Sequence, residues 1–119
     1  MKLITTLSIA CGLTFAMAAA AETITPEKVK EKAATCAACH GPDGNAATEA
    51  QAQYPRLAGQ YHDYLAQALH EYKTGARKNA IMAGMVAPLS DAEIDALSRY
   101  FGAMPSKLDD LAKHEQGSD

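Results

Sequence analysis

Residues 36–40 are Cys36-Ala37-Ala38-Cys39-His40, and the interpretation of the whole chain starts from this stretch. In an α-helix, side chains at positions i, i+3 and i+4 share one face. The thiols of Cys36 and Cys39 and the imidazole of His40 would therefore point the same way, while the two alanines between them add little bulk. Such a face can hold one flat group through two sulfurs and a nitrogen.

Four interpretations of this pattern differ in their chemistry. A disulfide between Cys36 and Cys39 is possible in an oxidising compartment, but it would close a very short loop and stabilise little. A thioredoxin-like pair needs a βαβ context, and structural zinc needs four ligands, usually from two paired clusters; the sequence offers neither. The Cys-x-x-Cys-His spacing is typical of covalent c-type haem attachment, with His40 as the proximal iron ligand. We therefore predict one haem c, bound covalently through Cys36 and Cys39.

The first 21 residues have the composition of a cleaved secretory signal. Lys2 supplies a positive charge, residues 3–18 are almost wholly apolar, and residues 18–21 are the small residues that a signal peptidase requires. The apolar run is too short for a permanent membrane helix, which needs about 20 residues. Cys11 lies inside this run, so we assign it to the removed segment. The sequence predicts a signal peptide over residues 1–21, export to the periplasm and no permanent membrane anchor.

The remaining 98 residues are predicted to form one small acidic domain. They contain ten Lys and Arg against 14 Asp and Glu, a net charge of about −4 before any haem propionates are counted. Nucleic-acid binding usually needs a basic patch, so this balance argues against it and suits docking onto basic patches of redox partner proteins. There is no Trp, and Phe101 is the one Phe after residue 21. A chain so short of core material needs a further staple, which a buried haem would supply.

Hydrophobic periodicity predicts an all-α domain with three main helices packed around one haem. The first helix covers Pro26–Cys39, with Thr25 as its N-cap and a proline in its first turn. Helix-breaking residues follow, and residues 41–56 are predicted to be a loop. The second helix covers Leu57–Thr74 and is stopped by Gly75. Its predicted apolar face consists of Tyr61, Tyr64, Leu65, Ala68, Leu69 and Tyr72.

The second half of the chain is predicted to hold one more helix. Residues 76–89 are predicted to form an irregular connector. The third helix begins at Ser90, because Ser90 and Glu93 have the spacing of a capping box. Its buried stripe consists of Ile94, Leu97 and Phe101. We predict a domain over residues 22–105 and a polar C-terminal tail over residues 106–119.

Haem iron in an electron carrier usually takes a second axial ligand from the chain. The candidates after residue 21 are Met82, Met85, Met104, His62, His70 and His114. The histidines of the second helix lie among charged residues, and Met104 lies at the end of the third helix. Met82 and Met85 lie in the predicted connector, which can fold over the haem opposite His40. A thioether raises the reduction potential relative to a second imidazole, because the softer sulfur favours ferrous iron. The residues alone leave both methionines open.

An ordered series of motifs covers the chain from Ala33 to Met104. It consists of Cys36-x-x-Cys39-His40-Gly41, Asp43-Gly44-Asn45, Tyr54-Pro55-x-Leu57-Ala58-Gly59-Gln60, Ile81-Met82-Ala83-Gly84-Met85 and Leu89-Ser90-Asp91. This series resembles class I c-type cytochromes, in particular the small bacterial periplasmic branch found as single-haem proteins and as two-haem tandems. The sequence has one haem motif, so it differs from a complete tandem, and residues 106–119 have no counterpart in the family pattern.

The resemblance implies roles for individual residues. His40 would be the proximal ligand, and Met82 rather than Met85 the distal one, because the family's ligand lies seven residues before the Leu-Ser start of the last helix. Pro55 would accept a hydrogen bond from the proximal imidazole through its carbonyl. The implied function is non-enzymatic: a haem that cycles between ferric and ferrous states shuttles single electrons between redox partners. The alternatives are a ligand sensor or small peroxidase with an open or displaceable sixth site, and a cytochrome subunit of a larger oxidoreductase.

Overall fold

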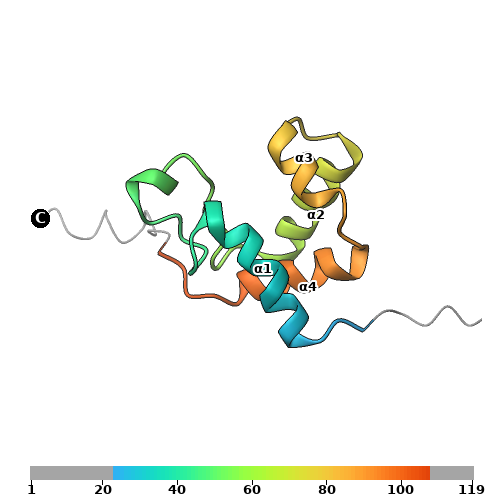
Figure 1. The fold of residues 1–119 in the computed structure, drawn as a ribbon, viewed down its shortest axis with the longest axis horizontal. Helices are drawn as coiled ribbons and strands as arrows, with labels where there is room; N and C mark the ends of the chain where they lie inside the picture. Colours follow the sequence, from blue (N-terminus) through green and yellow to red (C-terminus); the bar gives the residue numbers. More distant parts are fainter. Residues whose placement is uncertain (1–22, 108–119) are drawn as a thin grey trace, which may run out of the picture.

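The computed structural model describes residues 23–107, and every regular element within this range is a helix (Figure 1). The elements in chain order are α1 (Pro26–His40), the short 3₁₀ helix η1 (Glu49–Gln51), α2 (His62–Thr74), α3 (Ala80–Val86) and α4 (Asp91–Gly102). The predicted all-α class is therefore confirmed. The predicted signal peptide, residues 1–21, and residues 108–119 of the predicted tail lie outside the described range. Within that range, no helix combines the length and the apolar character needed to cross a membrane.

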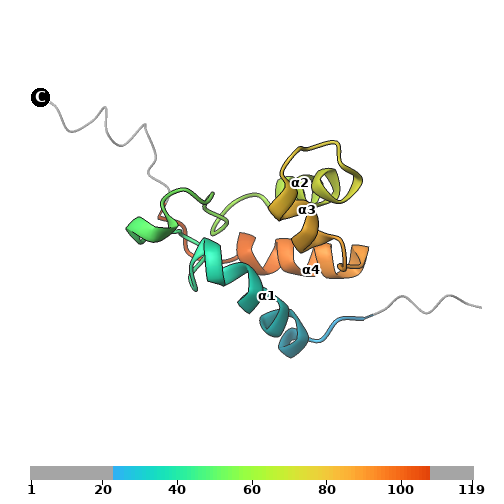
Figure 2. The same cartoon turned by 45° about the horizontal axis from the view of Figure 1, so that its top comes forward.

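Helix α4 is the centre of the packing. It contacts both α1 and α2, while α3 packs on α2. Figure 2 shows α4 between α1 on one side and the pair of α2 and α3 on the other. The buried residues that join these helices are Val29, Ala33, Leu65, Leu97 and Phe101. Tyr100 and Cys36 pack against the same cluster, so the last helix crosses the helix that carries the cysteines.

The predicted caps are present at the starts of α1 and α4. At α1 the Thr25 side chain accepts a hydrogen bond from the backbone N–H of Lys28. At α4 the predicted capping box is present: the Ser90 hydroxyl accepts from the Glu93 N–H, and the Glu93 carboxylate accepts from the Ser90 N–H. Glu93 is also buried and forms an ion pair with Lys32 of α1 at 2.8 Å. The same residue therefore starts α4 and connects it to α1.

The prediction misses one helix and misplaces the start of another. The predicted connector, residues 76–89, contains α3, whose N-cap Asn79 accepts a hydrogen bond from the Met82 N–H at 3.0 Å. Seven residues are too few for a helical period to stand out in a sequence. The second helix begins at His62 instead of Leu57, because the chain before it runs along α4, where the Gly59 N–H donates to the Phe101 carbonyl at 3.1 Å. That backbone position cannot also continue a helix.

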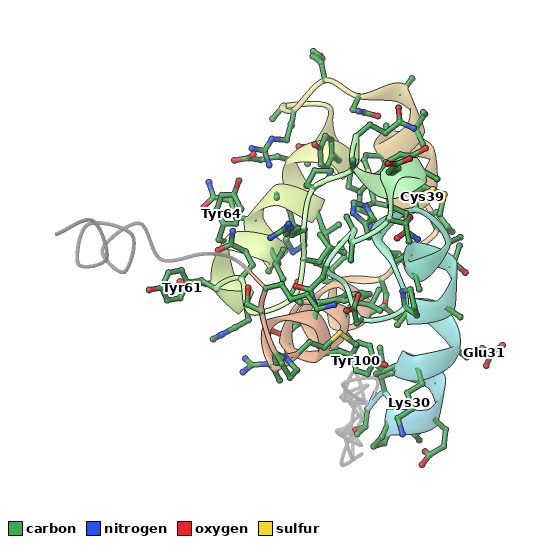
Figure 3. The ribbon with its side chains drawn as sticks, turned by 90° about the vertical axis from the view of Figure 1, so that its left-hand side faces the viewer. Lys30, Glu31, Cys39, Tyr61, Tyr64 and Tyr100 are labelled. Atoms are coloured by element: carbon green, nitrogen blue, oxygen red, sulfur yellow. The ribbon has the colours of Figure 1, made fainter. Side chains whose placement is uncertain are left out.

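The predicted apolar face of the second helix is only partly correct. Leu65 is buried, but Tyr61 is 80% exposed and Tyr64 is 47% exposed. Figure 3 shows the side chains of Tyr61 and Tyr64 projecting outward from α2. Tyr64 and Tyr72 instead lie against the guanidinium of Arg77, whose central carbon is 5.9 and 5.4 Å from their ring centroids. A tyrosine satisfies a helical pattern equally well in the core and at the surface, because it has an apolar ring and a polar end.

Candidate haem site

The last turn of α1 carries the Cys-x-x-Cys-His motif. Cys36 and Cys39 are free thiols, each partly buried, so the structure contains no disulfide between them. Burial raises the pKa of the Cys36 thiol, which keeps it protonated at neutral pH. Figure 3 places Cys39 toward the end of α1, and His40, which closes the helix, is buried at 7% exposure. The helix stops because Gly41 turns away at φ +88° while its N–H still bonds the Ala37 carbonyl at 2.9 Å.

The chain after α1 folds back toward the helix end that it has just left. The Ala46 N–H donates to the His40 carbonyl at 2.8 Å, and the N–H groups of Leu57 and Ala58 both donate to the Gly44 carbonyl. Gly44 has φ +68°, and a Cβ at this position would lie 3.1 Å from the Phe101 ring and 3.2 Å from the Ala58 nitrogen. Only glycine fits there without displacing its neighbours. This close approach fixes the loop against α4.

This loop places the carbonyl of Pro55 next to the His40 imidazole. The Nδ1 atom of His40 is 2.7 Å from the Pro55 carbonyl oxygen. A carbonyl oxygen can only accept, so Nδ1 carries the proton and donates it. The other ring nitrogen, Nε2, is then the one with a free lone pair, which is the state of a neutral imidazole ligand.

Tyr54, which the sequence analysis gave no role, lies beside the same imidazole. Its ring centroid is 6.0 Å from that of His40, and the two planes meet edge to face at 61°. The sequence signal was weak, because a tyrosine before a proline in a predicted loop points to no particular contact.

Asn45 also received no role from the sequence beyond its place in a turn. It is 1% exposed, and its side-chain amide donates to the carbonyls of Asp43 and Pro105 at 3.0 and 3.1 Å. Its side-chain oxygen accepts from the Lys107 N–H at 2.7 Å. Asn45 thereby connects the loop after the motif to the chain after α4. A hydrogen bond between residues 60 positions apart leaves no local pattern in a sequence.

Both candidate distal methionines lie on α3. Met82 is partly buried, whereas Met85 is 38% exposed and the neighbouring Ile81 is 67% exposed. A Cβ added at Gly84 would meet no atom within 4 Å, so open space adjoins this helix. Helix α3 buries one residue, Val86, and packs on α2 among the described elements. An apolar helix with so much uncovered surface is suited to covering an apolar group.

The other candidate ligands occupy different environments. Met104 packs against the core cluster at the end of α4. His62 is exposed, and the Nδ1 of His70 lies 3.8 Å from a carboxylate oxygen of the exposed Asp91. His114 lies outside the described residues.

The donor set and its surroundings fit a c-type haem. Two free thiols and an imidazole with an available Nε2 share the end of one helix, and α3 presents uncovered apolar side chains and a methionine thioether. The core among the described residues is small, and three of its nine buried apolar residues are alanines. The fold and site together define a class of protein: a small all-α domain built to hold a haem covalently.

The comparison with known protein families agrees with this class. Residues 27–104 match the family model described as Cytochrome c. The chain belongs to the cytochrome c family, and it is a class I c-type cytochrome related to the two-haem tandem cytochromes. Its cofactor is covalently bound haem c.

Individual relatives show how far the likeness extends. The chain is 47% identical over 73 residues to the thiosulfate dehydrogenase electron acceptor of Thiomonas intermedia, covering 61% of this chain and 33% of the relative. It is 36% identical over 102 residues to a cytochrome c4 of Pseudomonas aeruginosa, covering 86% of this chain and 48% of the relative. It is 36% identical over 77 residues to the cytochrome c-554(548) of Halomonas halodenitrificans, covering 62% of this chain and 89% of the relative. The chain thus spans a third to a half of the first two relatives.

Proposed function

We propose that this protein is a periplasmic electron shuttle with one haem, bound covalently through Cys36 and Cys39 and ligated axially by His40 and Met82. The observation that carries this proposal is the 2.7 Å hydrogen bond from His40 Nδ1 to the Pro55 carbonyl. It supports a proton on Nδ1, which would leave Nε2 free to bind iron. The same bond would make the imidazole a stronger electron-pair donor to iron, because the carbonyl oxygen attracts the Nδ1 proton and increases the basicity of Nε2.

Met82 is the better distal ligand of the two methionines for a structural reason. The Asn79 cap holds its backbone N–H at 3.0 Å, so the first turn of α3 has a fixed start. Met82 is also the more buried of the two, and a ligand inside the fold excludes water from the iron better than an exposed one. Met85, one turn further along α3, would then lie at the surface of the haem pocket.

The proposed activity needs no substrate at the metal. When bound, the haem iron supplies a one-electron ferric/ferrous couple. With His40 and Met82 both holding the iron, no position would be left for a substrate, so the chain would act as an electron carrier and catalyse no reaction of its own. The apolar side chains of α3 limit water around the haem, and low polarity together with a thioether ligand favours the ferrous state.

The proposed partners are other redox proteins, with basic patches as their docking surfaces. Residues 23–107 contain nine acidic and nine basic residues, so the acidic excess of the predicted mature chain comes from residue 22 and residues 108–119. Docking onto basic patches would therefore depend on these flanking residues and on the haem propionates. A relative named as the electron acceptor of thiosulfate dehydrogenase supports an enzyme as the donor. The periplasmic location rests on the predicted signal peptide.

Replacing each methionine in turn tests the ligand assignment. Met82→His in the haem-loaded protein should lower the midpoint potential strongly, because an imidazole favours ferric iron more than a thioether does. Met85→His, three residues away, is the matched control and should leave the potential close to that of the unmodified protein. An unchanged potential in Met82→His, or a larger shift in Met85→His, would refute Met82 as the ligand.

Carbon monoxide distinguishes the carrier from the sensor and peroxidase alternatives. A ferrous iron with both axial positions occupied should resist carbon monoxide at neutral pH, and oxidised protein should show the Met-to-iron charge-transfer band. Rapid binding of carbon monoxide by the unmodified protein would instead favour a sensor or an enzyme with an open or displaceable sixth site. Co-purification with a dehydrogenase in stable stoichiometry would favour a complex subunit.

A further inference from the structure

Tyr54 contacts the His40 imidazole and also lines a solvent-accessible hollow. One side of its ring meets the imidazole edge to face, with the two centroids 6.0 Å apart. The same residue lines a hollow of about 300 Å³, whose other walls include the polar side chains of Thr48, Glu49 and Arg56. Ala46, Ala47 and Ala52 complete its walls, and a hollow of this size that is open to solvent can hold several waters. Tyr54 thus borders both the imidazole and this hollow.

The backbone around Tyr54 gives its ring a defined position. Helix η1 precedes it, and the Tyr54 N–H donates to the Gln51 carbonyl at 2.8 Å. The next residue, Pro55, has a restricted φ and accepts the His40 Nδ1 proton through its carbonyl. Two consecutive residues thus contact the same imidazole: Pro55 accepts a hydrogen bond from it, and Tyr54 packs its ring against it.

We propose that Tyr54 is a positioning residue for the proximal ligand: its ring fixes the orientation of the His40 imidazole and keeps the water of the adjacent hollow away from it. This inference rests on the proposed role of His40 as the iron ligand. Water next to a ligand stabilises the more highly charged ferric state, so shielding by Tyr54 raises the reduction potential. The contact is made by the ring, so the effect belongs to the aromatic face and edge and does not need the hydroxyl.

Two substitutions in the haem-loaded protein test the proposal. Tyr54→Leu removes the aromatic contact and opens the hollow toward His40, so it should shift the ferric/ferrous equilibrium about tenfold toward ferric, which is about 59 mV lower in midpoint potential for one electron. The electron paramagnetic resonance spectrum of the ferric protein should also change, because its anisotropy reports the orientation of the axial ligand. Tyr54→Phe keeps the ring and should differ from the unmodified protein by less than about twofold in the same equilibrium.

A control separates the proximal contact from a general effect of losing a tyrosine. Tyr61→Leu removes a ring that is 80% exposed, and it should change neither the potential nor the spectrum. If Tyr54→Leu does not accumulate as folded protein, Tyr54→Met takes its place, because methionine fills the volume with a flexible chain but offers no ring. The proposal is overturned if the leucine or methionine variant keeps the original potential and spectrum, or if Tyr54→Phe shifts them as much as the aliphatic variant does.

The outcome is distinguishable from a failure of the proposed function. If His40 is not the iron ligand, His40→Ala retains the low-spin spectrum of the unmodified protein, and the electron-carrier assignment fails together with this inference. If His40 is the ligand and Tyr54 has no positioning role, His40→Ala loses that spectrum while Tyr54→Leu leaves the potential unchanged. Unfolding in urea, measured in parallel, shows whether a shifted potential accompanies a general loss of stability.

Discussion

The two sides of the proposed haem site are built very differently. The attachment segment, residues 36–58, contains several of the most buried residues of the described chain, among them His40, Asn45 and Ala58. Helix α3, which carries both candidate distal methionines, buries only Val86 and leaves Ile81 67% exposed. Figures 1 and 2 place the loop around η1 and helix α3 toward opposite ends of the domain.

This difference shows which contacts stabilise each side of the site. The attachment segment is held by its own backbone hydrogen bonds and by contacts with α4, so His40, the proposed proximal ligand, has its hydrogen-bond partner in the polypeptide itself. Helix α3 depends on one side-chain cap, on packing against α2 and on whatever covers its apolar surface. The proximal side is therefore preorganised, and the distal side should gain its stability from the bound haem.

The largest effect should come from removing both thiols. In Cys36→Ala/Cys39→Ala we expect complete loss of covalent haem and a fall in helical circular dichroism, because nine buried apolar residues, three of them alanine, are a small core. Mass spectrometry and the haem absorbance of the purified protein measure the first effect. Ala37→Ser/Ala38→Ser on the same turn should keep the haem. A colourless double alanine variant with full helical signal would mean that neither side of the site needs the haem for its structure.

A pair of glycines tests the rigidity of the attachment segment. Gly44 and Gly75 both have positive φ, +68° and +79°, so alanine at either position costs about 1–2 kcal/mol in backbone strain. At Gly44 the new methyl group would also press on Phe101 and the Ala58 backbone, whereas at Gly75 the nearest atom is the flexible Lys78 amine at 3.9 Å. Gly44→Ala should therefore lose about 1–3 kcal/mol more stability to urea than Gly75→Ala. Equal losses of stability in the two variants would show that the attachment segment adjusts to a new methyl group as readily as the surface turn at Gly75.

Two N-caps test the dependence of α3 on local order. Asn79→Ala and Ser90→Ala each remove a side-chain cap and should each cost about 1 kcal/mol in stability. Only Asn79→Ala should also speed carbon monoxide binding to the ferrous protein, because it loosens the turn that holds Met82. Ser90→Ala loosens α4 at its start and should retain the resistance to carbon monoxide. If both variants bind carbon monoxide at the same rate, the cap on α3 does not control the distal ligand.

The fold was predictable where local patterns coincide with the core. The stripe of Ile94, Leu97 and Phe101 and the capping box at Ser90 identified α4, and all three stripe residues are buried. Helix α3 was missed because its cap is one asparagine and its seven residues include two with large exposed side chains. Its packing against α2 is not visible in the sequence of residues 80–86. The exposed tyrosines of α2 were wrongly assigned to a buried face. The spacing of residues shows which side chains share a face of the helix, but it does not show whether another part of the fold covers that face.

The candidate site divides in the same way. The motif at residues 36–40 could be recognised because its geometry is contained in one helical turn. The roles of Asn45 and Tyr54 could not, because each depends on a fold that brings distant residues together: Asn45 to Pro105, and Tyr54 to His40. Pro55 was assigned only through the family resemblance, and the 2.7 Å distance from its carbonyl to His40 supports that role without testing it in a loaded protein.

The smallest predicted effect concerns the scaffold that both sides share. Lys32 of α1 and Glu93 of α4 form an ion pair, and the hydrogen bond from Lys32, followed by that from the Ser90 backbone, holds the pKa of Glu93 below its ordinary value of 4.5. A lowered folded pKa contributes stability that is complete above pH 4.5 and is lost as the pH falls through the folded pKa. Glu93→Gln can keep the capping bond to Ser90 and removes only the charge, so it should cost less than about 1 kcal/mol at pH 7.

The pH dependence of that variant separates scaffold from site. The difference in urea stability between the unmodified protein and Glu93→Gln should shrink as the pH is lowered below 4.5, because protonation removes the same charge from the unmodified protein. Asp95→Asn provides the matched control, since the ion pair of Asp95 with the exposed Arg99 lies within α4. Because α3 packs on α2 whereas the Lys32–Glu93 pair joins α1 to α4, the Glu93 change should leave carbon monoxide resistance intact at neutral pH. Loss of that resistance in Glu93→Gln would show that the position of α3 depends on the contact between α1 and α4 and not on the Asn79 cap and the haem.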